Sequence, residues 1–403
     1  MNVAIVGGGA SGLVCAITAA KMSKEKNSDS SVTVFESRER VGKKILATGN
    51  GRCNMLNMDK NPFYFSENGF HQYAIKRYDA SSNIRFFSEM GLFTRCDDEG
   101  RVYPLSNQAA SVLDFLRSEC ELYGVRIVSD CEITSIKKNG SQFLLNDKYK
   151  FDRVVLACGG KAGVKDFNGY ELLRQLKHPV TEVFPALTKI NTADPSDVKQ
   201  LQGIRHKVSL SLYFDKKFVA EEKGELLFAK YGISGIAVMQ LSSFVARAEK
   251  KNLVTISADL VPDFSFSKLT EFLTKRVLHD GRMPCGDILS GFMPKKLSEI
   301  VVKRAGISVS QNASLLDIKQ IENLVKIAKK YKFKVDSLRS FDDAQVTAGG
   351  ADTAYFDNKT MQSKLVSGLY AVGELLDVDG LCGGYNLMWA WSSGRLCGEN
   401  VIK

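Results

Sequence analysis

The residues between Val41 and Asn54, VGKKILATGNGRCN, have the composition of a ligand-binding loop. They include three glycines, two lysines, one arginine, two asparagines and one cysteine. Glycine lets the backbone approach a flat or anionic ligand closely. Lysine and arginine supply positive charge, and asparagine supplies paired donors and acceptors. This mixture predicts a loop that holds a large polar ligand, and a mobile surface loop is the structural alternative.

A second glycine-rich motif lies at the start of the chain. The apolar run Asn2–Val6 leads into G-x-G-x-x-G at Gly7–Gly12, and the next apolar run ends on Glu36, 24 residues beyond Gly12. The order of strand, glycine turn, helix, strand and acid is typical of a dinucleotide-binding βαβ unit. The helix N-terminus would face the pyrophosphate. Glu36 would accept hydrogen bonds from the adenosine ribose.

The polar loop at residues 42–54 favours FAD over NAD as the bound dinucleotide. It follows Glu36 closely, so it must run back across the carboxyl edge of the sheet, where the remainder of a ligand would lie. An NAD domain has no need of a second glycine-rich polar loop at that place. A longer dinucleotide with a three-ring system does need one, and we therefore expect FAD.

The C-terminal part of the chain contributes to the same predicted site. Residues 368–374, GLYAVGE, predict a strand that ends on Glu374, and residues 379–386 predict a turn before a terminal helix. The N-terminus of that helix would stabilise the negative charge that appears on a reduced flavin ring. Glu374 would hold a ribityl or phosphate-side hydroxyl. Trp389 and Trp391 are expected to pack in the core or against the ring.

Two more strands complete the predicted nucleotide-binding sheet. Residues 131–138 predict a strand whose backbone lies against the adenine, and residues 151–162 predict a buried strand that runs into Gly159 and Gly160. The fold class that follows is α/β, with a nucleotide-binding domain and a middle segment of different character. We predict the first part of the FAD domain at 1–190, the insert at 191–339 and the second part at 340–403.

The predicted insert has short strands followed by lysine-rich helical segments, and it contains no second G-x-G-x-x-G. A separate NAD(P)H-binding domain is therefore not expected, and NAD(P)H would bind transiently at the flavin face. The segment Gly232–Gly235 does not satisfy G-x-S-x-G. It predicts a tight loop between domains instead of a serine nucleophile.

Composition and charge limit the remaining classes of function. The chain has 403 residues and a net charge of +10, but its lysines fall in separate doublets without aromatic residues between them, which favours a solvated basic surface over a nucleic-acid site. Nine cysteines without a C-x-x-C pair argue against a metal or cluster. We see no secretory signal and no bilayer-length apolar run. We expect a cytoplasmic monomer or homodimer with a small-molecule substrate and no membrane partner.

The sequence resembles the BaiN/YhiN-type family of bacterial flavoproteins, which includes aminoacetone oxidases and bile-acid enoyl reductases. The resemblance rests on five blocks spread along the whole chain in order, which are VAIVGGGASGL (3–13), GKKILATGNGRCN (42–54), GELLFAKYGISG (224–235), QVTAGG (345–350) and GLYAVGELLDVDGLCGGYNLMWAWSSG (368–394). It implies a glutathione-reductase-like FAD-binding Rossmann domain that is interrupted by an inserted domain with β-rich and helical parts. It also implies that FAD is held by the two glycine-rich segments, the turn at 159–160 and the segment 373–386.

The motifs and the family resemblance together predict the residues that bind the cofactor. It comprises Gly7, Gly9, Ala10, Ser11, Gly12, Glu36, Ser37, Gly42, Lys43, Lys44, Thr48, Gly49, Asn50, Gly51, Arg52, Cys53, Asn54, Ile133, Ala157, Cys158, Gly159, Gly160, Gly373, Glu374, Gly384, Tyr385, Asn386 and Leu387. The predicted catalytic residues are Asn50, Arg52, Cys53, Lys230 and Thr347. Arg52 would hold an anionic or carbonyl group. For Cys53, packing against the ring is favoured over a catalytic role.

Three segments depart from the family pattern, at five positions in total, which are Leu56, Ala229, Lys230, Ile236 and Met388. The chain reads FAKYGISGI, with Lys230, where the family usually has FTHYGISGP. Leu56 replaces Thr or Ser, and Met388 stands where glutamine is common. We expect FAD binding to tolerate these changes. A substrate role that a histidine at position 230 would have in the family cannot be transferred to this chain, so the role of Lys230 has to be assessed separately.

These observations predict an FAD-dependent oxidoreductase that transfers hydride between a small organic substrate and flavin N5. The leading interpretation is an NAD(P)H-dependent reductase of an activated C=C bond, as in the bile-acid enoyl reductases that the sequence resembles. The alternatives are an oxygen-using amine oxidase of the aminoacetone type, a flavoprotein that acts on or with tRNA, and a flavin-binding protein without catalysis.

Overall fold

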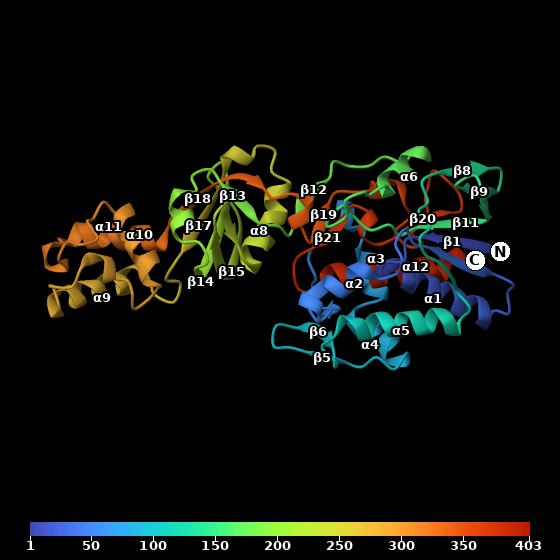
Figure 1. The fold of residues 1–403 in the computed structure, drawn as a ribbon, viewed down its shortest axis with the longest axis horizontal. Helices are drawn as coiled ribbons and strands as arrows, with labels where there is room; N and C mark the ends of the chain where they lie inside the picture. The colour runs from blue at the N-terminus through green and yellow to red at the C-terminus, as the bar shows by residue number, and fades with distance from the viewer. The chain divides into compact units, whose positions relative to one another are not determined.

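The computed structural model describes residues 1–403 apart from the side chain of Asn252. The chain forms two compact units (Figure 1). We call Met1–Phe184 together with Val346–Lys403 the Rossmann unit, and Pro185–Gln345 the inserted unit. The sequence placed the corresponding boundaries after residues 190 and 339.

A five-stranded parallel sheet forms the centre of the Rossmann unit. Its strand order is β20-β11-β1-β2-β7. The strands are β1 (Asn2–Val6), β2 (Ser31–Phe35), β7 (Arg126–Val128), β11 (Arg153–Leu156) and β20 (Leu369–Ala371). Ile5 of β1 lies opposite Val34 on one side and Val155 on the other. Buried parallel strands are apolar on both faces, which explains the uninterrupted run NVAIV at the start of the chain.

Helices α1 (Ala10–Glu25) and α12 (Tyr385–Val401) pack against each other beside the sheet, although they come from opposite ends of the chain (Figure 1). Glycines make their close approach feasible. A Cβ atom on Gly394 would lie 2.5 Å from the carbonyl oxygen of Ser11, and one on Gly398 would lie 2.7 Å from that of Cys15. Trp389 and Trp391 of α12 are almost fully buried, which confirms their predicted packing role.

Smaller elements surround this sheet. The other helices of the Rossmann unit are α2 (Lys43–Ala47), α3 (Gln72–Arg77), α4 (Ala80–Glu89), α5 (Ala109–Leu122) and α6 (Gly169–Gln175). Three small antiparallel sheets are also present. The first has the order β3 (Leu56–Asn57), β6 (Arg101–Pro104), β5 (Thr94–Cys96), and the second has the order β10 (Tyr149–Phe151), β9 (Gln142–Leu145), β8 (Ile136–Asn139). In the third, β21 (Val378–Gly380) pairs with β4 (Tyr64–Ser66). Short strands β12 (Phe184–Ala186) and β19 (Val346–Ala348) lie where the chain passes between units.

The predicted strand at 131–138 is wrong in extent and in place. Only β8, Ile136–Asn139, is a strand, and it pairs antiparallel with β9 outside the five-stranded sheet. Residues 131–135 have no regular structure. Their alternation of apolar and polar residues is that of a half-buried hairpin strand rather than a buried parallel one.

The inserted unit contains a closed barrel with the strand order β13-β16-β15-β14-β17-β18. The strands are β13 (Ile190–Thr192), β14 (Arg205–Phe214), β15 (Lys217–Ala229), β16 (Gly232–Ser234), β17 (Val254–Asp259) and β18 (Tyr331–Leu338). The helices of this unit are α7 (Ser196–Gln200), α8 (Ile236–Ala246), α9 (Phe266–His279), α10 (Lys295–Arg304) and α11 (Ile318–Lys329). An Asp317–Gln320 capping box starts α11, as such a sequence pair favours.

Two expectations for the insert are corrected by this barrel. The segment Gly232–Ser234 is strand β16, paired with β13 and β15, and not a loop between domains. The sequence also predicts a helical segment at DIKQIENLVKIAKKYKF (317–333), but helix α11 ends at Lys329 and strand β18 begins at Tyr331. Alternation of buried and exposed residues along Tyr331–Asp336 is the signal that the helical reading overlooked.

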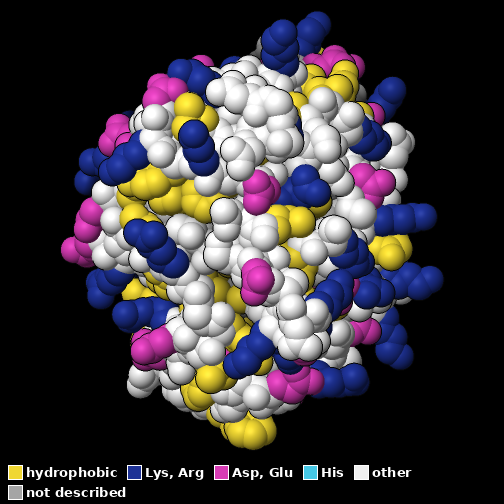
Figure 2. Space-filling view, turned by 90° about the vertical axis from the view of Figure 1, so that its right-hand side faces the viewer, with side chains coloured by type: hydrophobic (Ala, Val, Ile, Leu, Met, Phe, Trp, Pro, Cys, Tyr) yellow, Lys and Arg dark blue, Asp and Glu magenta, His cyan; other side chains and the backbone are white. Residues whose placement is uncertain are grey.

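Positive charge is divided unevenly between the units. The inserted unit has 26 Lys and Arg against 18 Asp and Glu, whereas the Rossmann unit has 29 against 27. Net charges of +8 and +2 follow. On the face drawn in Figure 2, Lys and Arg side chains are scattered among acidic and apolar ones. No helix in the described part of the chain is long and apolar enough to cross a membrane.

Candidate dinucleotide site

The turn between β1 and α1 has space for a ligand on one side only. A Cβ atom on Gly7 would lie 2.4 Å from the carbonyl oxygen of Ala157, and one on Gly12 would lie 2.0 Å from that of Gly7. A Cβ atom on Gly9 would meet no atom of the described residues within 4 Å. Gly7 and Gly12 are therefore needed for packing, and Gly9 borders open space. This is the arrangement that a phosphate group approaching the backbone requires.

The N-terminus of α1 opens onto the same space. Gly9 is its N-cap, and no side chain among the described residues caps it. The first N–H groups of a helix have no intrahelical acceptor and carry partial positive charge. Ala10, Ser11 and Gly12 therefore present donors where the sequence predicts the pyrophosphate.

Glu36 is held in place by backbone donors at the end of β2. Its carboxylate accepts hydrogen bonds from the N–H of Gly8 at 3.0 Å and from the N–H of Arg38 at 3.0 Å. The hydroxyl of Ser37, which was predicted to contact the cofactor, lies 3.4 Å from the same carboxylate. These contacts fix an acid beside the glycine turn, as adenosine recognition requires.

The loop at residues 42–54 has an unusual backbone. Gly49, Asn50, Gly51 and Cys53 all have φ between 54° and 82°. Such conformations are costly for residues other than glycine and concentrate at functional sites. They turn Asn50, Gly51 and Arg52 outward, where all three are exposed, while Thr48 and Asn54 are half-buried.

Lys44 connects this loop to the C-terminal part of the chain. Its Nζ lies 2.8 Å from a carboxylate oxygen of Glu374, which follows strand β20. The other oxygen of Glu374 accepts the N–H of Thr347 at 2.9 Å. A Cβ atom on Gly160 would lie 2.6 Å from both the Glu374 carboxylate and the Thr347 hydroxyl. Four segments that are far apart in the sequence therefore meet at one cluster.

Thr347 has a positioning part in this cluster. It is buried, and its hydroxyl accepts the N–H of Ala162 at 3.0 Å. Its backbone and side chain thus hold Glu374 and the end of the β11 segment together. The neighbouring Ala157 is buried, and Cys158 is half-buried with its Sγ 3.5 Å from the carbonyl oxygen of Val6.

The turn before α12 is closed by amide side chains. Asn386 accepts the N–H of Gly380 and donates to its carbonyl oxygen, both at 2.9 Å. Asn57 donates to the carbonyl oxygen of Gly383 at 2.9 Å. The indole of Trp389 donates to the carbonyl oxygen of Gly373 at 3.0 Å. Asn386 is therefore a turn-forming residue. The N-terminus of α12, which begins at Tyr385, lies beside the end of the loop of residues 42–54, since a Cβ atom on Gly384 would lie 2.8 Å from the Asn54 side chain.

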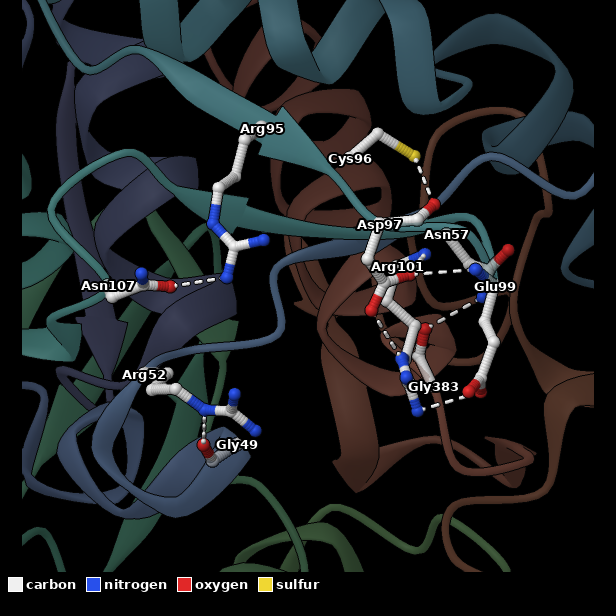
Figure 3. A network of polar contacts seen from close by, with 10 residues as sticks. All are labelled: Gly49, Arg52, Asn57, Arg95, Cys96, Asp97, Glu99, Arg101, Asn107 and Gly383. Carbon is white, nitrogen blue, oxygen red and sulfur yellow. Dashed lines mark hydrogen bonds and ion pairs between the residues drawn. The ribbon is translucent and has the colours of Figure 1, made fainter. Parts of the chain in front are cut away.

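Two arginines lie over one buried tyrosine beside that loop. The guanidinium carbons of Arg52 and of Arg95, on β5, each lie 5.2 Å from the ring centre of Tyr103. Arg52 donates to the carbonyl oxygen of Gly49, and Arg95 donates to Asn107 at 2.7 Å (Figure 3). The sequence predicted Arg52 but not Arg95 or Tyr103, because β3, β6 and β5 are too short to be recognised.

A second group that the sequence did not predict lies beside β21. Tyr64 of β4 is buried and donates its hydroxyl to the carbonyl oxygen of Tyr385 at 2.9 Å. His71 lies against the Tyr64 ring, with its Nδ1 2.6 Å from the hydroxyl oxygen of Ser66. Burial lowers the pKa of His71 to about 4, so its imidazole is neutral at pH 7. A lone histidine outside any motif gave no signal in the sequence.

Two other residues of the predicted site belong to different parts of the chain. Lys230 is exposed in the turn between β15 and β16 of the inserted unit. Ile133 is buried in the irregular segment before β8, and its carbonyl oxygen accepts a hydrogen bond from Asn168. Lys43 and Gly42 begin helix α2, where Gly42 donates its N–H to the carbonyl oxygen of Gly8 at 2.8 Å.

Cys53 is expected to resist alkylation. It is fully buried, and burial raises the pKa of its thiol to about 11, so at pH 8 only about one molecule in a thousand holds a thiolate. Cys96 is exposed and is the internal control. Iodoacetamide treatment at pH 8 followed by peptide mass mapping should label Cys96 and leave Cys53 intact until the protein is denatured. Equal labelling of both thiols would show that Cys53 is accessible and reactive.

Comparison with known proteins places these features in context. Residues 1–400 match the family model described as the HI0933-like protein Rossmann domain. The chain is 36% identical over 412 aligned positions to a 3-dehydro-bile acid delta(4,6)-reductase of Clostridium scindens, covering 100% of this chain and 99% of that protein. It is 30% identical to a ribosomal RNA dihydrouridine synthase of Haemophilus influenzae (99% and 98% covered) and 28% identical to one of Escherichia coli (99% and 97%).

Proposed function

The chain belongs to the HI0933-like family of flavin-dependent oxidoreductases, and we propose that it uses FAD and NAD(P)H to reduce a C=C bond conjugated to a carbonyl group. The observation that carries the proposal is the open space beside Gly9, bordered by the uncapped N-terminus of α1 and by the fixed carboxylate of Glu36. These groups fit the pyrophosphate and the adenosine ribose of a dinucleotide.

The remaining FAD contacts would come from the segments that meet at Glu374. Lys44 and the exposed residues Asn50 and Arg52 lie on the loop beside that cluster, and the N-terminus of α12 follows the turn closed by Asn386. When bound, FAD supplies hydride transfer at its N5 atom. The chain's own groups would hold the cofactor, orient the substrate and supply positive charge near the ring.

Arg52 is the residue best suited to orient a substrate. Its side chain is exposed, stacks on Tyr103 and has one hydrogen bond to its own loop. A planar guanidinium binds a carbonyl or carboxylate oxygen in a fixed direction. Cys53 is a poor nucleophile because it is buried and protonated, so its proposed role is packing.

The names of the relatives share one type of chemistry. A delta(4,6)-reductase of a 3-dehydro steroid acts on C=C bonds conjugated to a ketone, and dihydrouridine arises by reduction of the C=C bond conjugated to a uracil carbonyl. Reduction of such a bond is therefore proposed for this chain. A small organic substrate remains the leading choice, because the relative with the higher identity acts on one.

A uracil base in RNA is the second candidate substrate. The charge of +8 on the inserted unit favours it, because a polyanion is attracted to a basic unit irrespective of its sequence. The sequence alternative was a flavoprotein that acts on or with tRNA. The substrate proposed here is a uracil base in RNA of any kind. We place the protein in the cytoplasm in either case.

Anaerobic reduction of the purified protein tests the proposal. We expect NADH or NADPH to bleach the flavin absorbance, and a conjugated enone steroid or uridine-containing RNA to restore it without oxygen. Mass spectrometry should then show a gain of two hydrogens in the acceptor. A flavin that NAD(P)H does not reduce, but that an amine reduces and air reoxidises rapidly, would support the aminoacetone-type oxidase instead.

A further inference from the structure

We propose that one outer face of the barrel binds single-stranded RNA, with bases stacked on Tyr213 and Phe218. We call this surface the hairpin face. It is formed by outward-facing residues of β14, β15, β17 and β18, which are Ser211, Tyr213, Phe218, Thr255, Ser257, Lys332 and Lys334. The inference takes its choice of RNA from the second candidate substrate, and otherwise rests on the geometry of the inserted unit.

Strand alternation separates this face from the barrel interior. Along β18, Tyr331, Phe333 and Val335 are buried, whereas Lys332 and Lys334 between them are exposed. Along β17, Thr255 and Ser257 alternate with buried residues in the same way. Side chains of adjacent strands that lie opposite each other point to the same side of a sheet. Lysines and hydroxyls therefore share one surface.

Four side chains that lie opposite one another on adjacent strands, which we call a row, have the chemical types that bind a nucleic acid. Lys334 lies opposite Thr255, Thr255 opposite Tyr213, and Tyr213 opposite Phe218. The next row places Lys332 opposite Ser257. A cation, a hydroxyl and two aromatic rings in sequence can contact a phosphate, a ribose and a base, respectively.

One of the two aromatic rings is exposed, and the other is half-buried beside it. Phe218 retains 59% of its accessible surface, and its ring centre lies 6.0 Å from that of Tyr213 in an edge-to-face arrangement. A β-bulge between Leu212 and Tyr213 changes the register at this point, and bulges commonly re-aim side chains near functional sites. An exposed ring beside a half-buried one, with lysines on the same sheet face, is typical of base-stacking surfaces.

Further lysines lie at the end of the same face. Lys216 is in the two-residue turn between β14 and β15. Lys250 is exposed in a neighbouring loop. That loop lies next to the turn, because the Asp215 N–H donates a hydrogen bond to the carbonyl oxygen of Leu253. Glu221 is an acid on the face, and its carboxylate accepts the hydroxyl of Ser209 at 2.7 Å. Acidic side chains lie at the same end, because Asp215 and Glu249 are exposed beside Lys216 and Lys250. On the paired rows, Lys332 and Lys334 outnumber Glu221, which favours an anionic ligand over a neutral one there.

Binding of a labelled, uridine-rich single-stranded RNA of about 12 nucleotides to the full chain tests this inference. In fluorescence anisotropy at about 50 mM KCl, Phe218→Ala should weaken binding at least about fivefold, since one stacking contact is lost. Lys334→Gln should weaken it less, but should reduce the slope of log K against log salt by about one. The matched controls are Phe266→Ala and Lys268→Gln on α9, where both residues are exposed.

Three results would overturn the inference. One is the absence of RNA binding by the wild-type chain at low salt, and another is an equal loss in the α9 control variants. The third is binding to vesicles rich in phosphatidylglycerol that exceeds RNA binding and does not depend on Phe218, which would indicate an anionic membrane surface. Enone reduction by the wild-type protein is measured separately, so an active reductase that does not bind RNA contradicts this inference alone.

Discussion

Replacing Gly9 with valine is expected to give a folded protein without flavin. A Cβ atom at this position meets no atom of the described residues within 4 Å, and the backbone angles of φ −83° and ψ −168° are accessible to valine. The branched side chain would occupy the space that the pyrophosphate needs. Affinity for FAD should fall about 100-fold or more, because overpacking against a bound group costs about 3 kcal/mol.

Flavin content and thermal stability must be measured together for this variant. Gly291→Val is the matched control, because Gly291 also borders open space and is exposed in the inserted unit. The control should retain its flavin, and the apo forms of both variants should melt close to the apo wild type. A yellow Gly9→Val protein with normal flavin content would show that the cofactor does not approach the β1–α1 turn.

Replacing Gly394 with alanine is expected to destabilise the Rossmann unit by about 3 kcal/mol. Helix propensity alone predicts the opposite sign, since alanine is about 1 kcal/mol better than glycine inside a helix. The added Cβ would lie 2.5 Å from the carbonyl oxygen of Ser11, so α12 would have to move away from the N-terminal turn of α1. Urea unfolding of the apo protein followed by tryptophan fluorescence reports this change directly, because Trp389 and Trp391 are on the same helix.

Asn400→Ala provides the control within α12. Asn400 is half-buried near the end of the helix and hydrogen-bonds to the carbonyl oxygen of Leu396 in the same helix, so its replacement should change the free energy of unfolding by no more than about 0.5 kcal/mol. A Gly394→Ala protein more stable than the wild type would mean that α1 and α12 are less closely packed than described above.

The parts of the site that could be predicted from sequence are those with local signals. The βαβ unit was recognisable because Gly7, Gly9 and Gly12 stand between a buried strand and a helix, and because Glu36 ends the next strand. The polar loop at 42–54 was recognisable by composition. The meeting of Lys44 with Glu374, 330 residues later, followed from the rule that ligands gather at the carboxyl ends of parallel strands.

Other features depend on pairing between segments that the sequence does not mark. The Arg52, Arg95 and Tyr103 group forms only when three very short strands pair. Tyr331 and Phe333, the aromatic neighbours of Lys332 and Lys334 along the chain, are buried. Strand pairing is what brings Lys334 into one row with Tyr213 and Phe218. Residues 131–135 were misassigned because an alternating pattern does not reveal which sheet a strand joins.

The flavin content of the purified chain is the most direct test of the central claim, which is that the β1–α1 turn, the loop at 42–54 and the C-terminal segments together hold one FAD. Heat-released flavin should be identified by chromatography and compared with the protein concentration. We expect FAD at about one molecule per chain, either as purified or after incubation with added FAD. A colourless protein that takes up no FAD, or one that retains only FMN, would contradict the account.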